Sequence, residues 1–394
     1  MDTRNELIQI ENERFLQTYS RLPIVIENAK GCRITDKDGN TYLDFLGGIA
    51  VNVLVHSHPK ILQAINTQAQ RYLHLSNYFY QDAQIEFAEK LYSITKFPKI
   101  FLTNSGTESI EGALKLSRKW GSLNNKKEIL AFSNGFHGRT YGALSLMDNP
   151  IYKNGMGPFL ENIKIIPYNS IESLMENINL DVAAVFIEFI QGEGGISSVS
   201  QDFINLLIEL RKQNNFLIVA DEIQAGMGRT GKFFSFEHFG ITPDIVTLSK
   251  GLGGGLPLGA ILAQSHLANV WEKSQHGTTF GGNALSCAAG SVVLDEISGG
   301  LLNDIQENGS YLTKKLHDLK NKFPKLILEI RGLGFMQGLV LSFEAKKLVE
   351  VLLQNKVISN ATHTNVLRIV PPLIISKNDI DEFISALNTS LVSF

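Results

Sequence analysis

The chain is poor in cysteine, in excess charge of either sign and in long apolar runs. Its 394 residues include two cysteines, Cys32 and Cys287, which cannot form a disulfide framework and favour a reducing compartment, the cytoplasm. The 36 Lys and Arg nearly balance the 39 Asp and Glu, so the formal net charge is −3, and we expect neither nucleic acid nor membrane as a partner. No uninterrupted apolar run approaches the roughly 18 residues of a membrane helix, and the N-terminus lacks the apolar core of a signal peptide.

The composition is otherwise that of an ordinary globular protein, with 44% hydrophobic and 19% charged residues. Apolar runs alternate with stretches of helical period, which predicts an α/β fold. Short apolar runs at 99–104, 182–187, 216–220, 245–248 and 260–263 mostly end beside polar or charged residues. We interpret them as parallel strands whose carboxyl ends meet at one crevice, where ligands bind in open α/β sheets.

The pattern changes near residue 290. A long helix over 290–319 is followed by strands near 326–330, 339–342 and 366–370, which predicts a smaller α+β domain. The first 50 residues read as a short helix over 5–16 and a hairpin-like stretch that packs with this domain. We therefore expect two domains, a large one over 60–289 and a small one built from 1–59 and 290–394.

Asp221 and Lys250 are the most informative residues, because each follows an apolar run and they lie about one strand–helix–strand unit apart. Taken alone, the pair is as well explained by a structural ion pair as by a functional site. As a site it suits pyridoxal phosphate, since a lysine supplies the amine for a Schiff base and a carboxylate keeps the pyridine nitrogen protonated. The glycines of 251–255 would let the backbone pass close to such a cofactor.

The segment Ser105-Gly106-Thr107, placed before a helical pattern, is a candidate phosphate cradle, because a helix N-terminus offers free N–H donors. On its own, a plain N-cap is the better interpretation. Beside a lysine and an aspartate at other strand ends, the segment becomes the third part of one constellation.

The stretch Gly226–Lys232 matches two phosphate-binding patterns, G-x-G-x-x-G and G-x-x-x-x-G-K. Phe233 follows, however, where the second pattern needs a Ser or Thr for magnesium. A tight structural loop is therefore favoured, and a nucleotide-binding protein stays the alternative from another functional class.

No metal site is expected. His56 and His58 lack partners at ligand spacing, and His58-Pro59 is more typical of a helix start. His137 and His276 lie beside glycines and are interpreted as packing residues.

Arg139 and Arg368 each have two interpretations. Arg139 lies in the loop Phe136–Thr140, and Arg368 precedes Pro371-Pro372. Each could be a solvated charge, or its guanidinium could bind a carboxylate through two parallel hydrogen bonds.

Read together, these segments resemble the class III aminotransferases, a subgroup of the fold-type I pyridoxal phosphate enzymes. The resemblance runs through almost the whole chain and is carried by Gly-Ile-Ala-Val-Asn at 48–52 with His58-Pro59, Asn-Ser-Gly-Thr-Glu at 104–108, Phe-His-Gly-Arg-Thr at 136–140, Ile-Gln-Gly-Glu-Gly-Gly at 190–195, Asp-Glu-Ile-Gln at 221–224, the glycine loop at 226–231, Ser-Lys-Gly at 249–251, His-Gly-Thr-Thr-Phe-Gly-Gly-Asn at 276–283, and Arg368 with Pro-Pro-Leu at 371–373. It implies a mostly parallel seven-stranded sheet between helices in the large domain, a smaller α+β domain, and a homodimer with active sites at the subunit interface.

The resemblance also implies a set of cofactor residues. Lys250 would form the covalent link and then move the proton between substrate carbon and cofactor, while Asp221 would pair with the pyridinium. The remaining contacts would be Gln224 at the ring hydroxyl, Phe136 and Ile223 on the ring faces, Ser105, Gly106 and Thr107 at the phosphate, and Thr279 supplied to the phosphate by the partner subunit.

For the substrates, the resemblance implies that Arg139 binds the α-carboxylate of an N2-acylated ornithine. Arg368 would bind that of glutamate or 2-oxoglutarate, with Glu193 masking it in the other half-reaction, and Glu188 and Thr278 would lie near the same site. The implied reaction moves the δ-amino group to 2-oxoglutarate, giving a semialdehyde and glutamate, as in arginine biosynthesis. Acetyl is the usual acyl group of the family; succinylornithine, free ornithine and 4-aminobutyrate are the alternatives.

The sequence departs from the family pattern without removing a group that does chemistry. Phe189 and Ala284 stand where prolines are usual, and Val55 stands where glycine is usual. The stretch after the phosphate cradle reads Glu108-Ser109-Ile110-Glu111 in place of acidic-Ala-Asn-Glu. These departures affect the expected acyl specificity.

Overall fold

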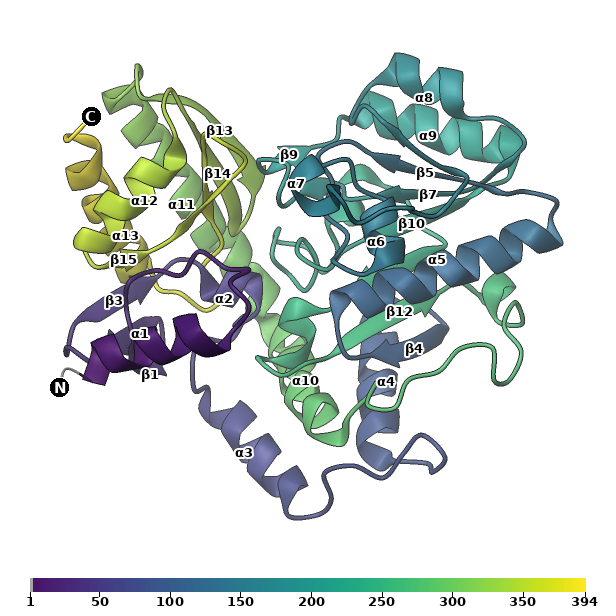
Figure 1. Cartoon of the computed structure of the whole chain (residues 1–394), viewed down its shortest axis with the longest axis horizontal. Helices are drawn as coiled ribbons and strands as arrows, with labels where there is room; N and C mark the ends of the chain where they lie inside the picture. Colours follow the sequence, from purple (N-terminus) through teal and green to yellow (C-terminus); the bar gives the residue numbers. More distant parts are fainter. Residues whose placement is uncertain (1–2) are drawn as a thin grey trace.

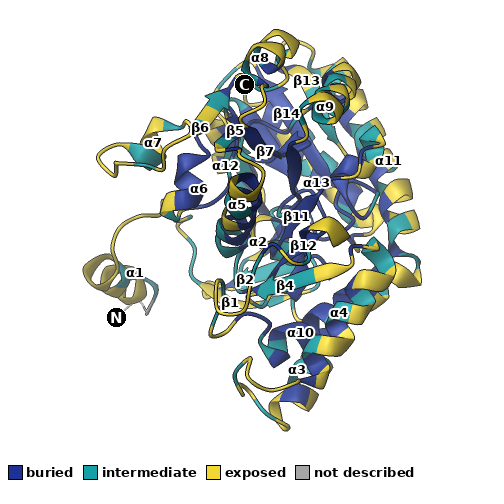
Figure 2. Ribbon diagram, turned by 90° about the vertical axis from the view of Figure 1, so that its right-hand side faces the viewer, coloured by how far each residue is buried: buried dark blue, intermediate teal, exposed yellow. Residues whose placement is uncertain are grey.

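A seven-stranded sheet forms the centre of the larger lobe in the computed structural model, which describes residues 3–394 (Figure 1). Its strand order is β4 (Lys99–Thr103), β12 (Gly259–Ala263), β11 (Ile245–Leu248), β10 (Leu217–Asp221), β7 (Val182–Ile187), β5 (Glu128–Phe132) and β6 (Ile163–Ile166). Every residue of β7, β10, β11 and β12 is buried, as uninterrupted apolar runs predict for strands covered on both faces (Figure 2). The mostly parallel sheet is confirmed.

One strand of the sheet runs against the others. β12 is antiparallel to both of its neighbours, β11 and β4, so the prediction that 260–263 joins the parallel set is wrong. A parallel crossover needs about a dozen residues or more and usually a helix. The link between β11 and β12 is shorter and holds only the 3₁₀ turn η2 (Lys250–Gly253), so the chain returns in the opposite direction.

Helices cover both faces of this sheet. Helix α5 (Gly106–Leu123) packs on one face, and α9 (Gln201–Asn214) with α8 (Ile171–Asn177) lies on the other (Figure 1). The short helices α6 (Tyr141–Ser145) and α7 (Pro150–Lys153) lie in the connection between β5 and β6. The remaining elements of this region are α4 (Asp82–Thr95), the two-residue strands β8 (Ile190–Gln191) and β9 (Ser197–Ser198), and the 3₁₀ turns η1 (Ser235–Phe239) and η3 (Ser265–Leu267).

The other lobe is built from both ends of the chain. One sheet has the order β1 (Ile26–Lys30), β2 (Arg33–Asp36), β3 (Thr41–Asp44), β15 (Val357–Ile358), and a second has β13 (Ile327–Leu333), β14 (Met336–Leu341), β17 (Val366–Ile369), β16 (Asn360–Thr362). The helices are α1 (Thr3–Arg14), α2 (Gly47–Ala50), α11 (Leu302–Lys322), α12 (Ala345–Gln354) and α13 (Lys377–Leu391). Helix α3 (Pro59–Ala69) lies outside this lobe and packs against α10 (Ala284–Glu296). Because β15 pairs with β3, we propose the division into a large domain over 60–289 and a small one over 1–59 and 290–394.

The long helix expected over 290–319 begins earlier and is interrupted. Helix α10 (Ala284–Glu296) starts where the side chain of Asn283 caps the N–H of Leu285, and it passes through a wide turn over 297–301 into α11. Gly300 has φ +114°, outside the helical region, so the glycine pair at 299–300 is what breaks the regular helix.

The segment Ala284–Lys322 is the one helical stretch within residues 3–394 that is long and apolar enough to cross a membrane by length and composition. Its window is 44% buried, and α10 packs against α3 and α4. Asp295 on this segment pairs with Lys90 at 2.6 Å, and Glu296 pairs with Lys60. These contacts are those of a core helix.

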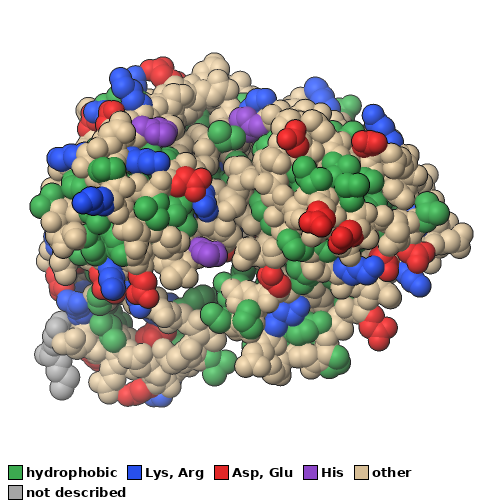
Figure 3. Space-filling model, turned by 90° about the horizontal axis from the view of Figure 1, so that it is seen from above, with side chains coloured by type: hydrophobic (Ala, Val, Ile, Leu, Met, Phe, Trp, Pro, Cys, Tyr) green, Lys and Arg blue, Asp and Glu red, His purple; other side chains and the backbone are tan. Residues whose placement is uncertain are grey.

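Charged side chains are interspersed on the surface. On the face seen from above, acidic and basic residues alternate without a broad patch of one sign (Figure 3), in keeping with the net charge of −3.

Val55 lies in an unfavourable backbone conformation. Its φ is +66°, a region that glycine adopts freely and a β-branched residue almost never does. It immediately precedes His56, whose backbone bridges Gly31 and whose Nε2 lies 2.7 Å from Asp44 Oδ2. The surrounding contacts therefore hold the strained turn in place.

Replacing Val55 with glycine should raise the free energy of unfolding by about 1 kcal/mol, since relief of the strain exceeds the added chain entropy. Urea unfolding followed by circular dichroism measures this. Val51→Gly is the matched control, because Val51 has φ −91° and the same change there should destabilise the protein. If both variants lose stability equally, the turn at Val55 is not strained.

Candidate active site

A cavity of about 240 Å³ at the carboxyl edge of the large sheet brings together most of the residues selected from the sequence. Its walls are Gly106, Thr107, Phe136, His137, Gly138, Arg139, Glu188, Asp221, Ile223, Gln224, Ser249 and Lys250. They come from the loops after β4, β5, β7, β10 and β11, as expected for ligand sites in open α/β sheets.

Lys250 and Asp221 reach this cavity from neighbouring strands. Asp221 is the last residue of β10, and it pairs in register with Thr247 of the parallel strand β11. Lys250 follows β11 in a turn with φ +46°. Burial lowers the pKa of Lys250 to about 8, with the Arg368 charge adding to the effect and the nearby carboxylates opposing it. The amine is therefore available unprotonated close to neutral pH.

Asp221 is held by a residue that the sequence did not single out as functional. Its Oδ2 lies 2.7 Å from Nδ1 of His137, and both side chains are almost fully buried. Its Oδ1 accepts the backbone N–H of Ile223 at 3.1 Å. Burial lowers the pKa of His137, but the hydrogen bond and charge of Asp221 outweigh burial and raise it overall. The imidazole thus keeps a charged carboxylate in one orientation.

Nothing in the spacing shows the His137–Asp221 contact, because the residues are 84 positions apart. The one available signal is that His137 lies between Phe136 and Arg139, two residues already selected. His276, by contrast, packs as interpreted, between Phe101 and Trp271.

Glu188 lies in the same buried part of the cavity wall as His137 and Asp221. Its carboxylate accepts the backbone N–H groups of Phe136 at 2.9 Å and Gly192 at 3.1 Å. Burial raises its pKa to about 7, with the charge of His137 opposing and that of Asp221 adding. Glu188 therefore fixes the two loops that border the cavity.

Neighbouring residues approach the backbone of the candidate phosphate cradle closely. Gly106 begins α5, and a Cβ there would lie 2.9 Å from Ile223. A Cβ on Gly138 would lie 2.4 Å from Oγ1 of Thr107, and that hydroxyl is 2.8 Å from the hydroxyl of Thr140. Backbone donors and a hydroxyl thus converge at the N-terminus of an 18-residue helix, an arrangement that suits a phosphate.

Ser105 is the N-cap of this helix, accepting the N–H of Glu108 at 3.4 Å. Its position agrees with the N-cap interpretation.

Arg368 is 2% exposed and lies behind the cavity wall, in contact with Gln224. Its Nη1 donates to Glu193 Oε1 and, at 3.3 Å, to Gln224 Oε1, while its Nε donates to Asn360 at 3.1 Å. Burial raises the pKa of Glu193, but the charge and hydrogen bond of Arg368, together with the Lys250 charge and a hydrogen bond from Thr362, lower this pKa overall. The structure therefore pairs the two residues that the sequence analysis linked.

Arg139 differs from Arg368 because it is exposed. Its guanidinium carbon lies 3.8 Å from the ring centroid of Tyr152 and 5.4 Å from that of Phe136. The two arginines thus offer carboxylate-binding groups at separate places around Lys250.

The Gly226–Lys232 stretch is a buried loop. Arg229 within it is 1% exposed, and its Nη1 donates to the carbonyl of Pro371. The residues after it form the five-residue 3₁₀ turn η1, with no α-helix to face a phosphate. This supports the structural-loop interpretation over nucleotide binding.

Comparisons with known proteins agree with this geometry. A profile of the family described as "Aminotransferase class-III" matches residues 15–391. The chain is 42% identical to the acetylornithine aminotransferase of Caldanaerobacter subterraneus subsp. tengcongensis over 98% of this chain and 99% of that one. It belongs to the class III aminotransferases.

Solved structures show the same likeness. The acetylornithine aminotransferase from Elizabethkingia anophelis has a TM-score of 0.89 at 32% identity and covers 100% of both chains. An ornithine aminotransferase from Toxoplasma gondii, with partial occupancy of PLP at its active site, has a TM-score of 0.93 at 29% identity, over 99% of this chain and 94% of that one.

The cofactor of this aminotransferase is pyridoxal phosphate, and the residues present fit it. Lys250, Asp221 and Gly106 line one cavity. The amine of Lys250, with its lowered pKa, suits the aldehyde, and the carboxylate of Asp221, oriented by His137, suits the ring nitrogen. Gly106, where a Cβ would lie 2.9 Å from Ile223, begins the helix whose N-terminus suits the phosphate.

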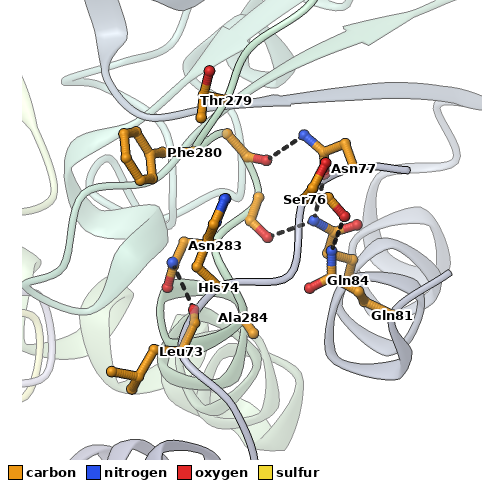
Figure 4. A pocket seen from close by; sticks show the side chains of 12 residues that line it. Leu73, His74, Ser76, Asn77, Gln81, Gln84, Thr279, Phe280, Asn283 and Ala284 are labelled. Atoms are coloured by element: carbon orange, nitrogen blue, oxygen red, sulfur yellow. Dashed lines mark hydrogen bonds between the residues drawn. The ribbon is translucent and has the colours of Figure 1, made fainter. Parts of the chain in front are cut away.

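Five predicted residues of the aminotransferase do not line the Lys250 cavity of the same chain: Ser105, Glu193, Arg368, Thr278 and Thr279. Thr279 is exposed and belongs to a separate hollow beside residues 73–84, where Figure 4 shows its side chain directed away from Asn77 and Gln84. Thr278 accepts a hydrogen bond from Asn104 at 3.1 Å through its Oγ1 and another from Asn77 at 3.1 Å through its carbonyl. The loop is therefore anchored, with Thr279 presented outward.

The lowered pKa of Lys250 predicts its reactivity in the cofactor-free aminotransferase. The neutral amine is the nucleophile, and it predominates above the pKa. Labelling by an amine-directed reagent, followed at this residue by mass spectrometry, should therefore rise with a midpoint near pH 8. Arg368→Met removes the second cause of the shift and should move the midpoint upward. A midpoint near the ordinary lysine pKa of about 10.4 in both proteins would contradict the electrostatic account.

Proposed function

We propose that this aminotransferase moves the δ-amino group of N2-acetylornithine to 2-oxoglutarate, giving N-acetylglutamate 5-semialdehyde and glutamate, a step of arginine biosynthesis. The carrying observation is that Lys250 and Asp221 face one cavity that two separate arginines border. The choice of donor is supported by the acetylornithine aminotransferase of Caldanaerobacter subterraneus subsp. tengcongensis, which is 42% identical, whereas an ornithine aminotransferase of Staphylococcus aureus is 38% identical.

When bound, pyridoxal phosphate supplies the electron sink for breaking a bond at the amine-bearing carbon. Asp221, oriented by His137, would hold a positive charge at the ring nitrogen. Gln224 would contact the ring hydroxyl, and Phe136 and Ile223 would lie on the two ring faces. The amine of Lys250 would take the proton from the substrate carbon and deliver it to the aldehyde carbon of the cofactor, because its lowered pKa of about 8 leaves more of it unprotonated than an ordinary lysine.

Other residues of the chain bind the phosphate and the two substrates. Ser105, Gly106 and Thr107 hold the phosphate at the start of α5. Arg139 binds the α-carboxylate of the amino donor, which places the distal δ-amino group at Lys250. In this half-reaction Glu193 occupies Arg368, and Glu188 keeps the neighbouring loops in place. For 2-oxoglutarate, Glu193 must leave so that Arg368 can bind the α-carboxylate.

Replacing Lys250 with alanine should remove the visible absorption band of the cofactor-loaded protein and abolish turnover, because no other amine is placed beside Asp221 in this cavity. Lys232→Ala is the matched control, since Lys232 is the lysine of the rival glycine loop and donates only to the carbonyl of Glu237 at 2.9 Å among its described contacts. It should keep both the band and the activity. A yellow, active Lys250→Ala protein would overturn the assignment.

A donor panel with 2-oxoglutarate as acceptor tests the substrate. We expect glutamate formation to have the highest kcat/KM with N2-acetylornithine, lower values with succinylornithine and ornithine, and the lowest with 4-aminobutyrate. If 4-aminobutyrate turns over while both acylornithines fail, the proposed donor is wrong although the family is unchanged.

The proposal includes a homodimer in which each subunit supplies Thr279 to the other's phosphate site. Thr279 is directed outward next to the exposed Phe280, and Asn77, which donates to the carbonyl of Thr278, precedes the exposed aromatic run 78–80. Tyr78 is 96% and Tyr80 99% exposed, and exposed apolar side chains of this size are typical of an interface. We place this dimer in the cytoplasm, where free thiols such as Cys32 and Cys287 persist.

Mixing two inactive variants tests the shared site. A Lys250→Ala subunit paired with a Thr279→Ala subunit contains one intact site, so refolding the two together should restore about a quarter of wild-type activity. If Thr279 served its own subunit, the mixture would stay inactive.

Sedimentation velocity tests the interface itself. The double variant Tyr78→Ser with Tyr80→Ser should lower the dimer fraction, while Leu180→Ser, at another exposed apolar residue, should leave the dimer fraction unchanged.

A further inference from the structure

Arg139 is held by aromatic rings although it is exposed. Its guanidinium carbon lies 3.8 Å from the ring centroid of Tyr152, closer than to Phe136 at 5.4 Å. The two rings meet edge to face, with centroids 5.8 Å apart and planes at 86°. Phe136 thus braces Tyr152, and Tyr152 presents its face to the guanidinium, the geometry in which a ring attracts a cation.

The position of Tyr152 depends on a short, well-defined turn. Asn149 caps α7 by accepting the N–H of Ile151 at 3.0 Å, and Pro150 begins the helix. The preceding residue, Asp148, accepts the N–H of Asn134 at 3.0 Å, which ties the turn to the loop after β5. Tyr152 is half-buried as a result, so contacts with the protein hold its ring in place.

Tyr152 also faces a second cavity. This outer cavity of about 520 Å³ is lined by Tyr152 and Glu193 together with Asn134, Gly135, Asp148, Asn149, Pro150, Ile151, His363 and Thr364. Glu193 is the carboxylate that pairs with Arg368, so the outer cavity adjoins the reaction site. Tyr152 thus contacts Arg139 on one side and lines this outer cavity on the other.

We propose that Tyr152 is a positioning residue that determines affinity for the amino donor. Its ring face holds the Arg139 guanidinium in the orientation that receives the donor α-carboxylate. An exposed arginine samples many rotamers, and ordering it on binding weakens affinity. Stacking on Tyr152 orders the Arg139 side chain before the donor arrives, so this entropy cost is no longer part of binding. The inference rests on the proposed function, in which Arg139 serves the donor.

Three substitutions in the holoenzyme test this, with KM measured separately for N2-acetylornithine and 2-oxoglutarate. Tyr152→Leu should raise the donor KM by up to about fivefold, as expected for loss of an exposed cation–ring contact, and leave the 2-oxoglutarate KM unchanged. Tyr152→Phe keeps the ring and should restore the donor KM to within about twofold, since the ring face carries the effect. Tyr141→Leu is the matched control, because Tyr141 lies on the adjacent helix and its ring contacts Phe159; it should change neither KM.

A double-mutant cycle separates this inference from the proposed function. Tyr152→Leu added to Arg139→Ala should raise the donor KM no further, because Tyr152 acts through Arg139. Equal effects on both substrates, or additive effects in the cycle, would overturn the positioning role. If Arg139→Ala alone leaves the donor KM unchanged, the proposed role of Arg139 fails and the inference falls with it.

Discussion

The amine of Lys250 and the carboxylate of Asp221 share one cavity because β10 and β11 are adjacent and run in the same direction. Every strand around them is buried on both faces, so water cannot solvate the charges that collect at their ends. Burial makes the lysine a weaker base than usual, and it makes the carboxylates depend on partners inside the protein. The chemistry of the site follows from this exclusion of water.

The buried carboxylates are kept in place by different means. Asp221 has an imidazole and a backbone N–H as hydrogen-bond partners, which fix the orientation of its carboxylate. Glu188 has two backbone N–H donors but also a carboxylate neighbour, and its pKa of about 7 reflects that balance. One group is thereby fitted to stabilise a positive ring nitrogen, whereas the other joins two loops. Two acidic residues a few ångströms from the same histidine thus serve different purposes.

The two arginines show a similar contrast. Arg368 is buried and paired with Glu193; under the proposed function, a carboxylate of the acceptor would take the place of Glu193. Arg139 is exposed and rests on the face of Tyr152, which orders the guanidinium without occupying its hydrogen-bond donors. An enzyme that binds a large donor and a small diacid in turn needs one guanidinium that is free and one that can be masked. The different surroundings meet both needs.

The sequence by itself determined the fold class, the parallel core strands, and most of the residues around Lys250. It could do so because each chemical group follows an apolar run directly, and residues at strand ends share one edge of a sheet. The tertiary structure alone decided the reversal of β12, the break at Gly300, the outward direction of Thr279, and the contacts of His137 and Tyr152. Contacts such as that of His137 with Asp221 join residues far apart in the chain, so local periodicity cannot predict them. The direction of a strand depends on the length and path of the connection before it, which local periodicity does not predict either.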